Sequence, residues 1–284
     1  MSQISRALIY VSLILNGATA FAGIEAEPNE WIMLFNGNNL DGWTVKITGQ
    51  PLGVDPANTF RVADGLLQVR YDDYETFDGQ FGHLFYQHPF SHYALQVEYR
   101  FTGEQLKGGP AGWAVRNSGV MLHAQAPATM TLQQDFPTSI EAQFLGGLSD
   151  GKARPTASVC TPGTDISVDG QIYAHHCLPS RSATYDGDQW VSMTVVVLGG
   201  GRITHYVEGE EVLSYHQPQL DTAQAHAKNK TSKSLGSGYI ALQSESHPVD
   251  FRQVRLLNLA GCTDPDAKNH QVYFIKSEPG SCIY

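Results

Sequence analysis

Short runs in which apolar and polar residues alternate recur along this chain, and turn dipeptides separate them. The clearest run covers residues 92–101 (HYALQVEYRF), where aromatic and aliphatic residues alternate with Gln96, Glu98 and Arg100. Successive side chains of a strand point to opposite faces of a sheet, so one face of this run is apolar and the other is polar. This pattern is typical of antiparallel strands with one face on the core and the other in water.

Turn signals set the spacing of these runs. Asp64-Gly65 separates two alternating runs in FRVADGLLQVR and predicts a β-hairpin, and Glu208-Gly209 turns the later run RITHYVEGEEVLSYH. Helical periodicity with capping residues is nearly absent. The pattern predicts an all-β protein built as an antiparallel β-sandwich or jelly roll. With 284 residues, 42% of them hydrophobic, the chain suits one large domain of this class or two small ones.

The first residues have the features of an export signal. Arg6 precedes the apolar run of residues 7–15, which is too short to span a membrane comfortably, and residues 20–22 (AFA) offer a small-x-small cleavage site. We therefore expect residues 1–22 to be a signal peptide and the mature protein to be exported, to the periplasm or beyond. No other stretch of the sequence is long and apolar enough to cross a bilayer.

The formal net charge of −10 restricts the choice of partner. Nucleic acid and anionic membrane surfaces carry negative charge and are disfavoured as ligands of such a protein. A neutral small ligand fits this balance better. No feature of the sequence indicates an oligomeric state.

Four cysteines agree with an oxidising compartment. Cys160 and Cys177 bracket a loop rich in Gly, Pro and Asp, whereas Cys262 and Cys282 bracket the C-terminal tail. Of three possible pairings we predict 160–177 and 262–282, because each closes a short segment with little core of its own. Zinc binding is the alternative, but the chain has no CxxC pair and the tail cysteines have no His at zinc spacing.

Polar residues gather in two neighbouring predicted strands within residues 117–147. His123 and Gln125 alternate with apolar residues in NSGVMLHAQ, and Glu141 and Gln143 do so in SIEAQFLGG. If the apolar sets face a common core, the four polar side chains converge on one surface. An imidazole, a carboxylate and two amides can bind a sugar and supply an acid/base pair.

Three more residues are candidates for sugar contacts. Trp113 in GGPAGWAVRNSG can stack on a sugar ring, whereas the other tryptophans are expected to fill the core. Gln243 and Arg252 lie in the last two predicted strands. Each has a structural alternative, since Arg252 can pair with Glu245 or Asp250 and Gln243 can make an internal hydrogen bond.

The connection of residues 146–189 is long for a compact domain, and it carries His175 and His176 beside its two cysteines. Long loops are usually functional or stapled. This loop is either a surface excursion pinned by a disulfide or a wall over the surface that carries His123 and Glu141.

Several motifs together resemble one known family over about residues 29–259. They are LFNGNNLDGW, FRVADGLLQV, NSGVMLHAQ, IEAQFLGG, GDQWVSMTVVV and GYIALQSESHPVDFRQVRLLNL, in that order. Together they resemble the 3-keto-disaccharide hydrolase domain family, which is similar in fold to concanavalin A-like lectins and glucanases. The resemblance implies a hydrolase-like jelly roll over residues 23–259, with residues 260–284 as a Cys-bracketed appendage outside it.

The resemblance also implies a chemistry. A ketone at C3 of a glycoside acidifies the hydrogen at C2, a base removes that proton, the aglycone leaves C1, and water then adds back. This implies Glu141 and His123 as base and acid in either order, with Gln143, Gln243 and Arg252 binding hydroxyls or the enolate. No cofactor is expected. A divalent cation could hold the enolate oxygen, but nothing in the sequence specifies one.

Two other functions are considered. A non-catalytic carbohydrate-binding module is the main alternative, because jelly rolls host both activities; it needs aromatic platforms and no acid/base pair. A laminarinase-type glucanase depends on two carboxylates about 5 Å apart. On a single strand these would appear as ExDxxE, and that spacing does not occur here.

Overall fold

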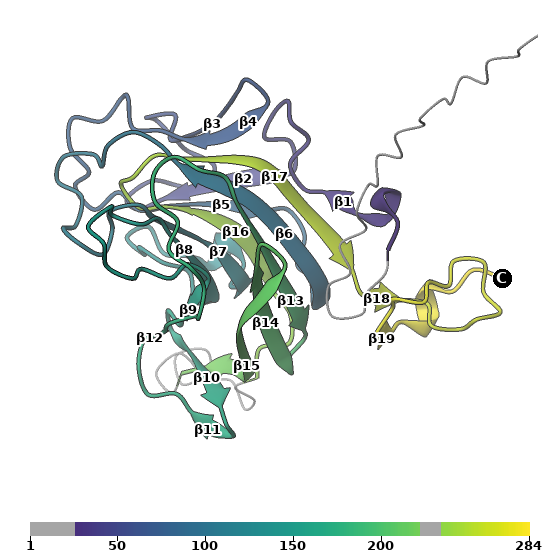
Figure 1. Cartoon of the computed structure of the whole chain (residues 1–284). Helices are drawn as coiled ribbons and strands as arrows, with labels where there is room; N and C mark the ends of the chain where they lie inside the picture. Colours follow the sequence, from purple (N-terminus) through teal and green to yellow (C-terminus); the bar gives the residue numbers. More distant parts are fainter. Residues whose placement is uncertain (1–25, 222–233) are drawn as a thin grey trace, which may run out of the picture.

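Two curved antiparallel sheets lie one over the other in this computed structural model, which describes residues 26–221 and 234–284 (Figure 1). Helical structure within these residues is confined to three short 3-10 turns, Pro28–Glu30, Pro127–Thr129 and Pro279–Ser281. The all-β prediction is confirmed. The expected signal peptide, residues 1–22, lies outside the described residues. Among the described residues, no helix has the length and apolar character to span a membrane.

The first sheet has seven strands and carries the polar segment singled out in the sequence. Its strands, in spatial order, are β12 (Cys177–Leu178), β9 (Ser158–Cys160), β8 (Ile140–Leu145), β7 (Asn117–Ala124), β16 (Tyr239–Ser244), β5 (Gly82–Tyr86) and β2 (Trp43–Ile47). The two strands predicted to be neighbours, β7 and β8, are therefore paired in the middle of this sheet.

The second sheet forms the other layer. Its strands, in spatial order, are β11 (Gln171–Ile172), β10 (Thr164–Val168), β15 (Glu210–Leu220), β14 (Arg202–Val207), β13 (Val191–Leu198), β6 (His92–Phe101), β17 (Val249–Asn258), β4 (Leu66–Val69) and β3 (Phe60–Ala63), with β1 (Ile32–Met33) paired to β17. The hairpin predicted at Asp64-Gly65 joins β3 to β4, and both residues have the positive φ that such a tight turn requires.

The core fills the space between the two sheets, as the alternation in β6 predicts. Tyr93, Leu95 and Val97 of this strand are buried in the main apolar cluster. Tyr99 stacks on Phe144 of the opposite sheet with ring centroids 4.2 Å apart, which joins the two layers directly. The matching inward residues of the first sheet are Val120, Leu122, Ile140 and Ala142.

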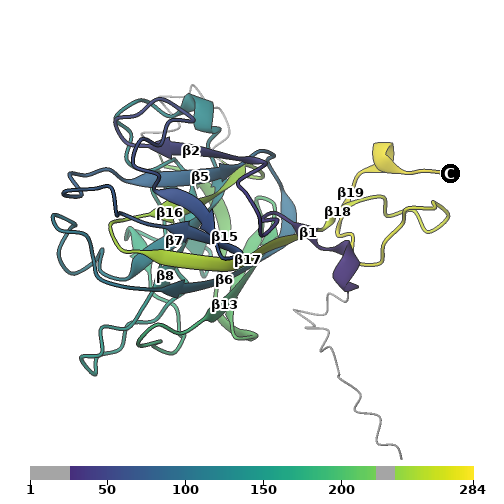
Figure 2. The same cartoon turned by 90° about the horizontal axis from the view of Figure 1, so that it is seen from above.

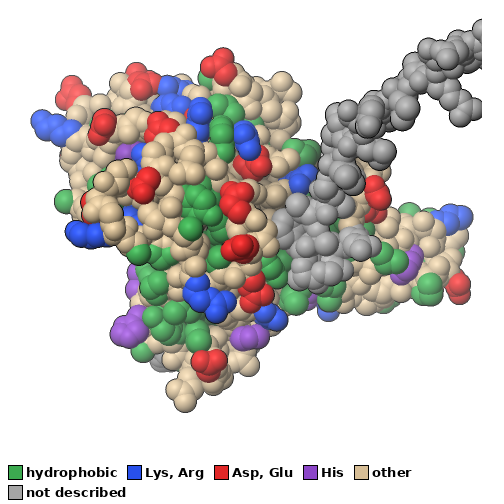
Figure 3. All heavy atoms as spheres, in the orientation of Figure 1, with side chains coloured by type: hydrophobic (Ala, Val, Ile, Leu, Met, Phe, Trp, Pro, Cys, Tyr) green, Lys and Arg blue, Asp and Glu red, His purple; other side chains and the backbone are tan. Residues whose placement is uncertain are grey.

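Both predicted disulfides are confirmed. Cys160–Cys177 links β9 to β12 across a cross-strand pair, and Cys262–Cys282 closes the C-terminal segment. That segment holds the two-residue strands β18 (Ala260–Gly261) and β19 (Lys276–Ser277) and projects from the sandwich beyond the end of β17 (Figure 2). On the face shown in Figure 3, acidic and basic side chains are intermixed.

Candidate active site

A cavity of about 400 Å³ opens on the face of the seven-stranded sheet that points away from the core. This volume lies in the range of small-molecule sites. The wall combines buried polar groups with aromatic rings and a disulfide. Its residues are Trp113, Asn117, Phe136, Glu141, Gln143, Cys160, Pro162, His176, Cys177 and Glu245.

Glu141 reaches this cavity because of the alternation along β8. Ile140 and Ala142 point into the core, so Glu141 and Gln143 point outward. The neighbouring strand β7 presents Gly119 there, and a Cβ added to this glycine would lie 2.7 Å from Oε1 of Glu141. The Glu141 side chain therefore lies over Gly119, in space that only a glycine leaves open.

The carboxyl group of Glu141 is well shielded from water, with 6% of the residue exposed. Burial raises its pKa to about 8, and the amide of Gln243 next to it partly lowers this pKa again. In the described part of the chain Glu141 forms no ion pair. A carboxyl group that takes up and releases its proton near neutral pH is suited to acid/base chemistry.

Glu245 is a second carboxyl group in the same cavity wall, and the sequence analysis considered it only as a partner of Arg252. It follows the last residue of β16, is 2% exposed, and its Oε2 has no hydrogen-bond partner. Burial raises its pKa well above the usual value, and the charge of Glu141 raises it further. The alternation in YIALQSES, which places Gln243 and Glu245 on one face, was the available signal for this residue.

An aromatic platform and two amides complete the wall. Trp113 is 52% exposed, and its indole stacks on Phe81 with ring centroids 6.3 Å apart. Asn117 is buried with an Oδ1 that has no partner, and Gln143 is half-buried. Flat indole faces and amide groups match the apolar faces and the hydroxyl groups of a sugar.

A second hollow adjoins the first and shares two of its residues. It has a volume of about 460 Å³ and is lined in part by Leu148, Lys152 and Arg154. Trp113 and Gln143 line both hollows and therefore stand between them. The site thus offers adjoining spaces on either side of an indole and an amide.

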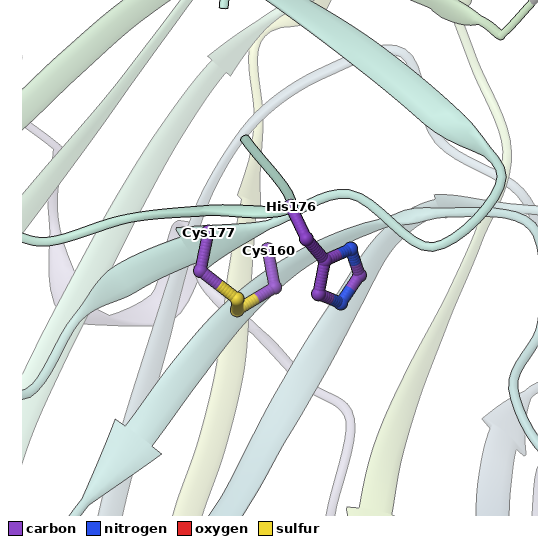
Figure 4. Close-up of side chains that lie close together, drawn as sticks. All are labelled: Cys160, His176 and Cys177. Atoms are coloured by element: carbon purple, nitrogen blue, oxygen red, sulfur yellow. A yellow bond between two sulfur atoms is a disulfide. The ribbon is translucent and has the colours of Figure 1, made fainter. Parts of the chain in front are cut away.

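The long loop before β12 forms a wall of the site, as one of the two alternatives predicted. His176 lies beside the Cys160–Cys177 disulfide (Figure 4). It lines the same cavity as Glu141. The ring nitrogen of His176 and the two sulfur atoms lie within 4.8 Å of one another, and no other group of three possible metal ligands occurs among the described residues. Because both sulfurs are bonded to each other, they are not available as thiolate ligands.

The expected convergence of His123 with Glu141 is wrong. The pairing of β7 with β16 shifts register at this position, and His123 has a φ of +49°. Such a β-bulge adds one residue to a strand and reverses the alternation after it. The His123 ring therefore points into the core, where its edge meets Tyr93 and its Nε2 donates to the carbonyl oxygen of Gly199 at 3.0 Å. Burial lowers the pKa of this imidazole to about 4.

Two of the predicted sugar contacts lie away from the cavity. The amide of Gln125 bonds to the side chain of Gln134 and to the backbone N–H of Thr138, which ties together the loop after β7. Arg252 lies in the other sheet, where its Nε donates to Glu98 at 2.6 Å. This pairing also replaces the one expected with Glu245 or Asp250.

Gln243 lies below the cavity and contacts Glu141. Next to Gln243 lies a histidine that the sequence analysis missed. His83 of β5 is the cross-strand neighbour of Gln243, and both its ring nitrogens are buried without hydrogen-bond partners. Burial lowers the pKa of His83 to about 3, so its ring is neutral. The signal for His83 is a polar residue at an outward position of a strand that is otherwise apolar.

The fold and the cavity define an antiparallel β-sandwich with two buried carboxyl groups in the wall of its site. The chain belongs to the 3-keto-alpha-glucoside-1,2-lyase-like domain family, whose model matches residues 30–257. This confirms the resemblance stated from the sequence motifs. No curated protein sequence matches the chain.

Solved structures with a similar fold include two candidate glycosyl hydrolases from Parabacteroides distasonis. One is 14% identical and covers 80% of this chain and 98% of its own, with a TM-score of 0.48. The other is 18% identical and covers 82% of this chain and 97% of its own, also with a TM-score of 0.48. A carbohydrate-binding module from Bacillus subtilis is 11% identical, covers 75% and 93%, and has a TM-score of 0.43.

Proposed function

We propose that this protein is an exported hydrolase that cleaves the glycosidic bond of a 3-keto-glycoside. The observation that carries the proposal is the buried carboxyl group of Glu141, which faces a sugar-sized cavity without a positively charged partner. Membership of a family described by action on 3-keto-glucosides supports the substrate class. Two disulfides support export, because such bonds persist in oxidising compartments.

The proposed reaction begins with Glu141 as the base. Its carboxylate takes the proton from C2, which the ketone at C3 acidifies, and the electrons of that C–H bond form the C1–C2 double bond. The bond from C1 to the glycosidic oxygen breaks, and the aglycone leaves with that electron pair and a proton. Water then adds its oxygen to C1 and a proton to C2, so the net reaction is hydrolysis.

The remaining wall residues are assigned to binding. The exposed face of Trp113 packs against the apolar face of a sugar ring, and the amides of Asn117 and Gln143 bind its oxygens. Because Trp113 and Gln143 stand between the two hollows, the keto-sugar occupies the cavity of Glu141 and the aglycone extends into the second hollow.

Turnover of a 3-keto-disaccharide by the wild type, by Glu141→Gln and by Glu211→Gln tests this proposal. Glu211 is an exposed residue of the other sheet and provides a matched control. We expect wild-type turnover, a loss of roughly 10²–10⁴-fold in Glu141→Gln and no change in Glu211→Gln. Equal rates for wild type and Glu141→Gln would remove Glu141 from the mechanism.

Two further outcomes would replace the proposal. Wild-type protein that binds glycans without cleaving the keto-sugar would be a carbohydrate-binding module. Equal turnover of the same disaccharide without the keto group would show that elimination next to a ketone is not the reaction.

A further inference from the structure

We propose that Glu141 and Glu245 form one catalytic pair that holds a single proton, with Glu141 ionised as the base and Glu245 protonated as the acid for the leaving oxygen. This inference rests on the proposed function and adds a residue to it. In the reaction, Glu141 gains the C2 proton as Glu245 gives its proton to the glycosidic oxygen, so the pair again holds one proton after the aglycone leaves. Transfer of a proton from Glu141 to C2 and of a water proton to Glu245 then restores the starting state.

The two carboxyl groups come from strands on opposite sides of one intervening strand. Glu141 belongs to β8 and Glu245 directly follows β16, with β7 between them. Strand spacing places β8 and β16 about 10 Å apart. The two residues are also offset along the strands, because Met121 pairs with both Glu141 and Ala241, and Glu245 lies four residues after Ala241. The intervening strand presents Gly119, and the Glu141 side chain lies over it, on the side that carries Gln243 and Glu245. Both carboxyl groups line the same cavity.

Both groups are too buried for two charges to coexist. Glu245 is 2% exposed and Glu141 6% exposed, and the Oε2 of Glu245 has no partner. Two carboxylates that share a dry site retain one proton between them, because both desolvation and mutual repulsion oppose the second ionisation. The proton resides on Glu245, the more deeply buried of the two.

Within the described ranges, no ion pair offsets the charge of this pair. The ammonium group of Lys46 donates to the backbone carbonyls of Ile47 and Leu132, and Arg116 pairs with Asp188. Among the side chains that titrate or carry charge, His176 lines the cavity with the two carboxyl groups, and Tyr71 interacts with Glu245. Asp150, Lys152 and Arg154 line the adjoining hollow.

His176 is the competing candidate for the acid, since its ring lines the same cavity. It is exposed on the loop wall, whereas Glu245 is buried in the wall of the cavity that Glu141 also lines. An acid in the dry part of the site keeps its proton until the leaving oxygen arrives.

Leaving-group dependence tests the role of Glu245. The substrates are a 3-keto-disaccharide, whose alkoxide leaves poorly, and the 4-nitrophenyl 3-keto-glucoside, whose phenolate leaves without a proton. We expect Glu245→Gln to lose roughly 100-fold or more on the disaccharide and less than about tenfold on the nitrophenyl substrate. Glu141→Gln should lose activity on both, because C2 deprotonation is common to them.

Equal losses on the two substrates in Glu245→Gln, or no loss on either, would overturn the assignment. The same split in His176→Gln, with Glu245→Gln unaffected, would make His176 the acid. The wild-type pH profile of kcat/KM should fall on the alkaline side for the disaccharide, which needs the proton of Glu245, and should fall much less for the nitrophenyl substrate.

Infrared difference spectroscopy tests the shared proton without turnover. At neutral pH the wild type should show the band of a buried protonated carboxyl group. Glu245→Gln should shift this band, replacement of both Glu141 and Glu245 by Gln should remove it, and Glu211→Gln should retain it. A missing band in the wild type overturns the pair. Wild-type inactivity on both substrates with the band present refutes the proposed reaction and the acid and base roles, and leaves only the proton-sharing pair standing.

Discussion

Gly119→Ala offers the most direct perturbation of the site, because it moves Glu141 without changing any polar group. The new Cβ would lie 2.7 Å from Oε1 and 3.0 Å from Cγ of Glu141. An ordinary contact needs about 3.4 Å, so the carboxyl group must move by about 0.7 Å. The third neighbour, the carbonyl oxygen of Ala142 at 3.3 Å, requires only a slight adjustment.

A displacement of this size matters more for catalysis than for folding. Misplacing a catalytic group by about 1 Å can cost about 100-fold in rate, or about 2.7 kcal/mol of transition-state stabilisation. Overpacking costs about 1–3 kcal/mol of folding stability, with the low end expected here because the main clash is with a flexible side-chain end. We therefore expect a large loss of kcat/KM with a small decrease in Tm.

The assay compares kcat/KM on the 3-keto-disaccharide with Tm for Gly119→Ala and Gly280→Ala. Gly280 provides the control because a Cβ there meets no atom within 4 Å. Full activity in Gly119→Ala would refute the argument that Glu141 needs the space over this glycine. A Tm decrease large enough to unfold the variant at the assay temperature would refute the expectation that the substitution affects catalysis more than folding.

Three other perturbations have defined outcomes. Because burial raises the pKa of both Glu141 and Glu245, the folded pair holds a proton that the unfolded carboxyl groups release, and stability falls as the pH rises from about 4.5 to 8. Glu141→Gln should therefore raise Tm at about pH 8 and not at about pH 4, and an equal difference at both pH values in thermal melts would contradict this. His123→Ala should lower the free energy of unfolding by about 2–4 kcal/mol in denaturant experiments, because it empties a core position and leaves a carbonyl unpaired. The kcat of the folded fraction should stay unchanged, and a selective loss of kcat would instead place His123 in the reaction. Replacing Cys160 and Cys177 by Ser should lower the free energy of unfolding by about 3 kcal/mol. It should also raise KM, since the wall that carries His176 loses its link to β9. An unchanged KM would show that this wall does not touch the substrate.

Local patterns predicted the parts of the site that depend on alternation within one strand. The period-two pattern of β8 correctly directed Glu141 and Gln143 outward, because Ile140 and Phe144 are large and apolar and must face the core. The pairing of Cys160 with Cys177 likewise followed from a loop that has little apolar content of its own.

The parts that failed depend on how strands pair. His123 follows the same alternation in the sequence as Glu141 does, and nothing in its neighbours marks the extra residue that turns it inward. Glu245 lies about 100 residues from Glu141 in the chain, so their meeting depends on β16 adding beside β7. The sequence analysis considered a carboxyl pair on one strand only, so it did not consider a pair from two strands.

The bulge in β7 also affects how this chain is to be compared with relatives. In a relative whose strand lacks the extra residue, the position aligned with His123 would project into the cavity, whereas here it projects into the core. Matching columns of an alignment therefore need not be matching places in space beyond Leu122. A superposition of strand backbones, rather than residue identity, must decide which side chain of a homologue takes the place of each one here.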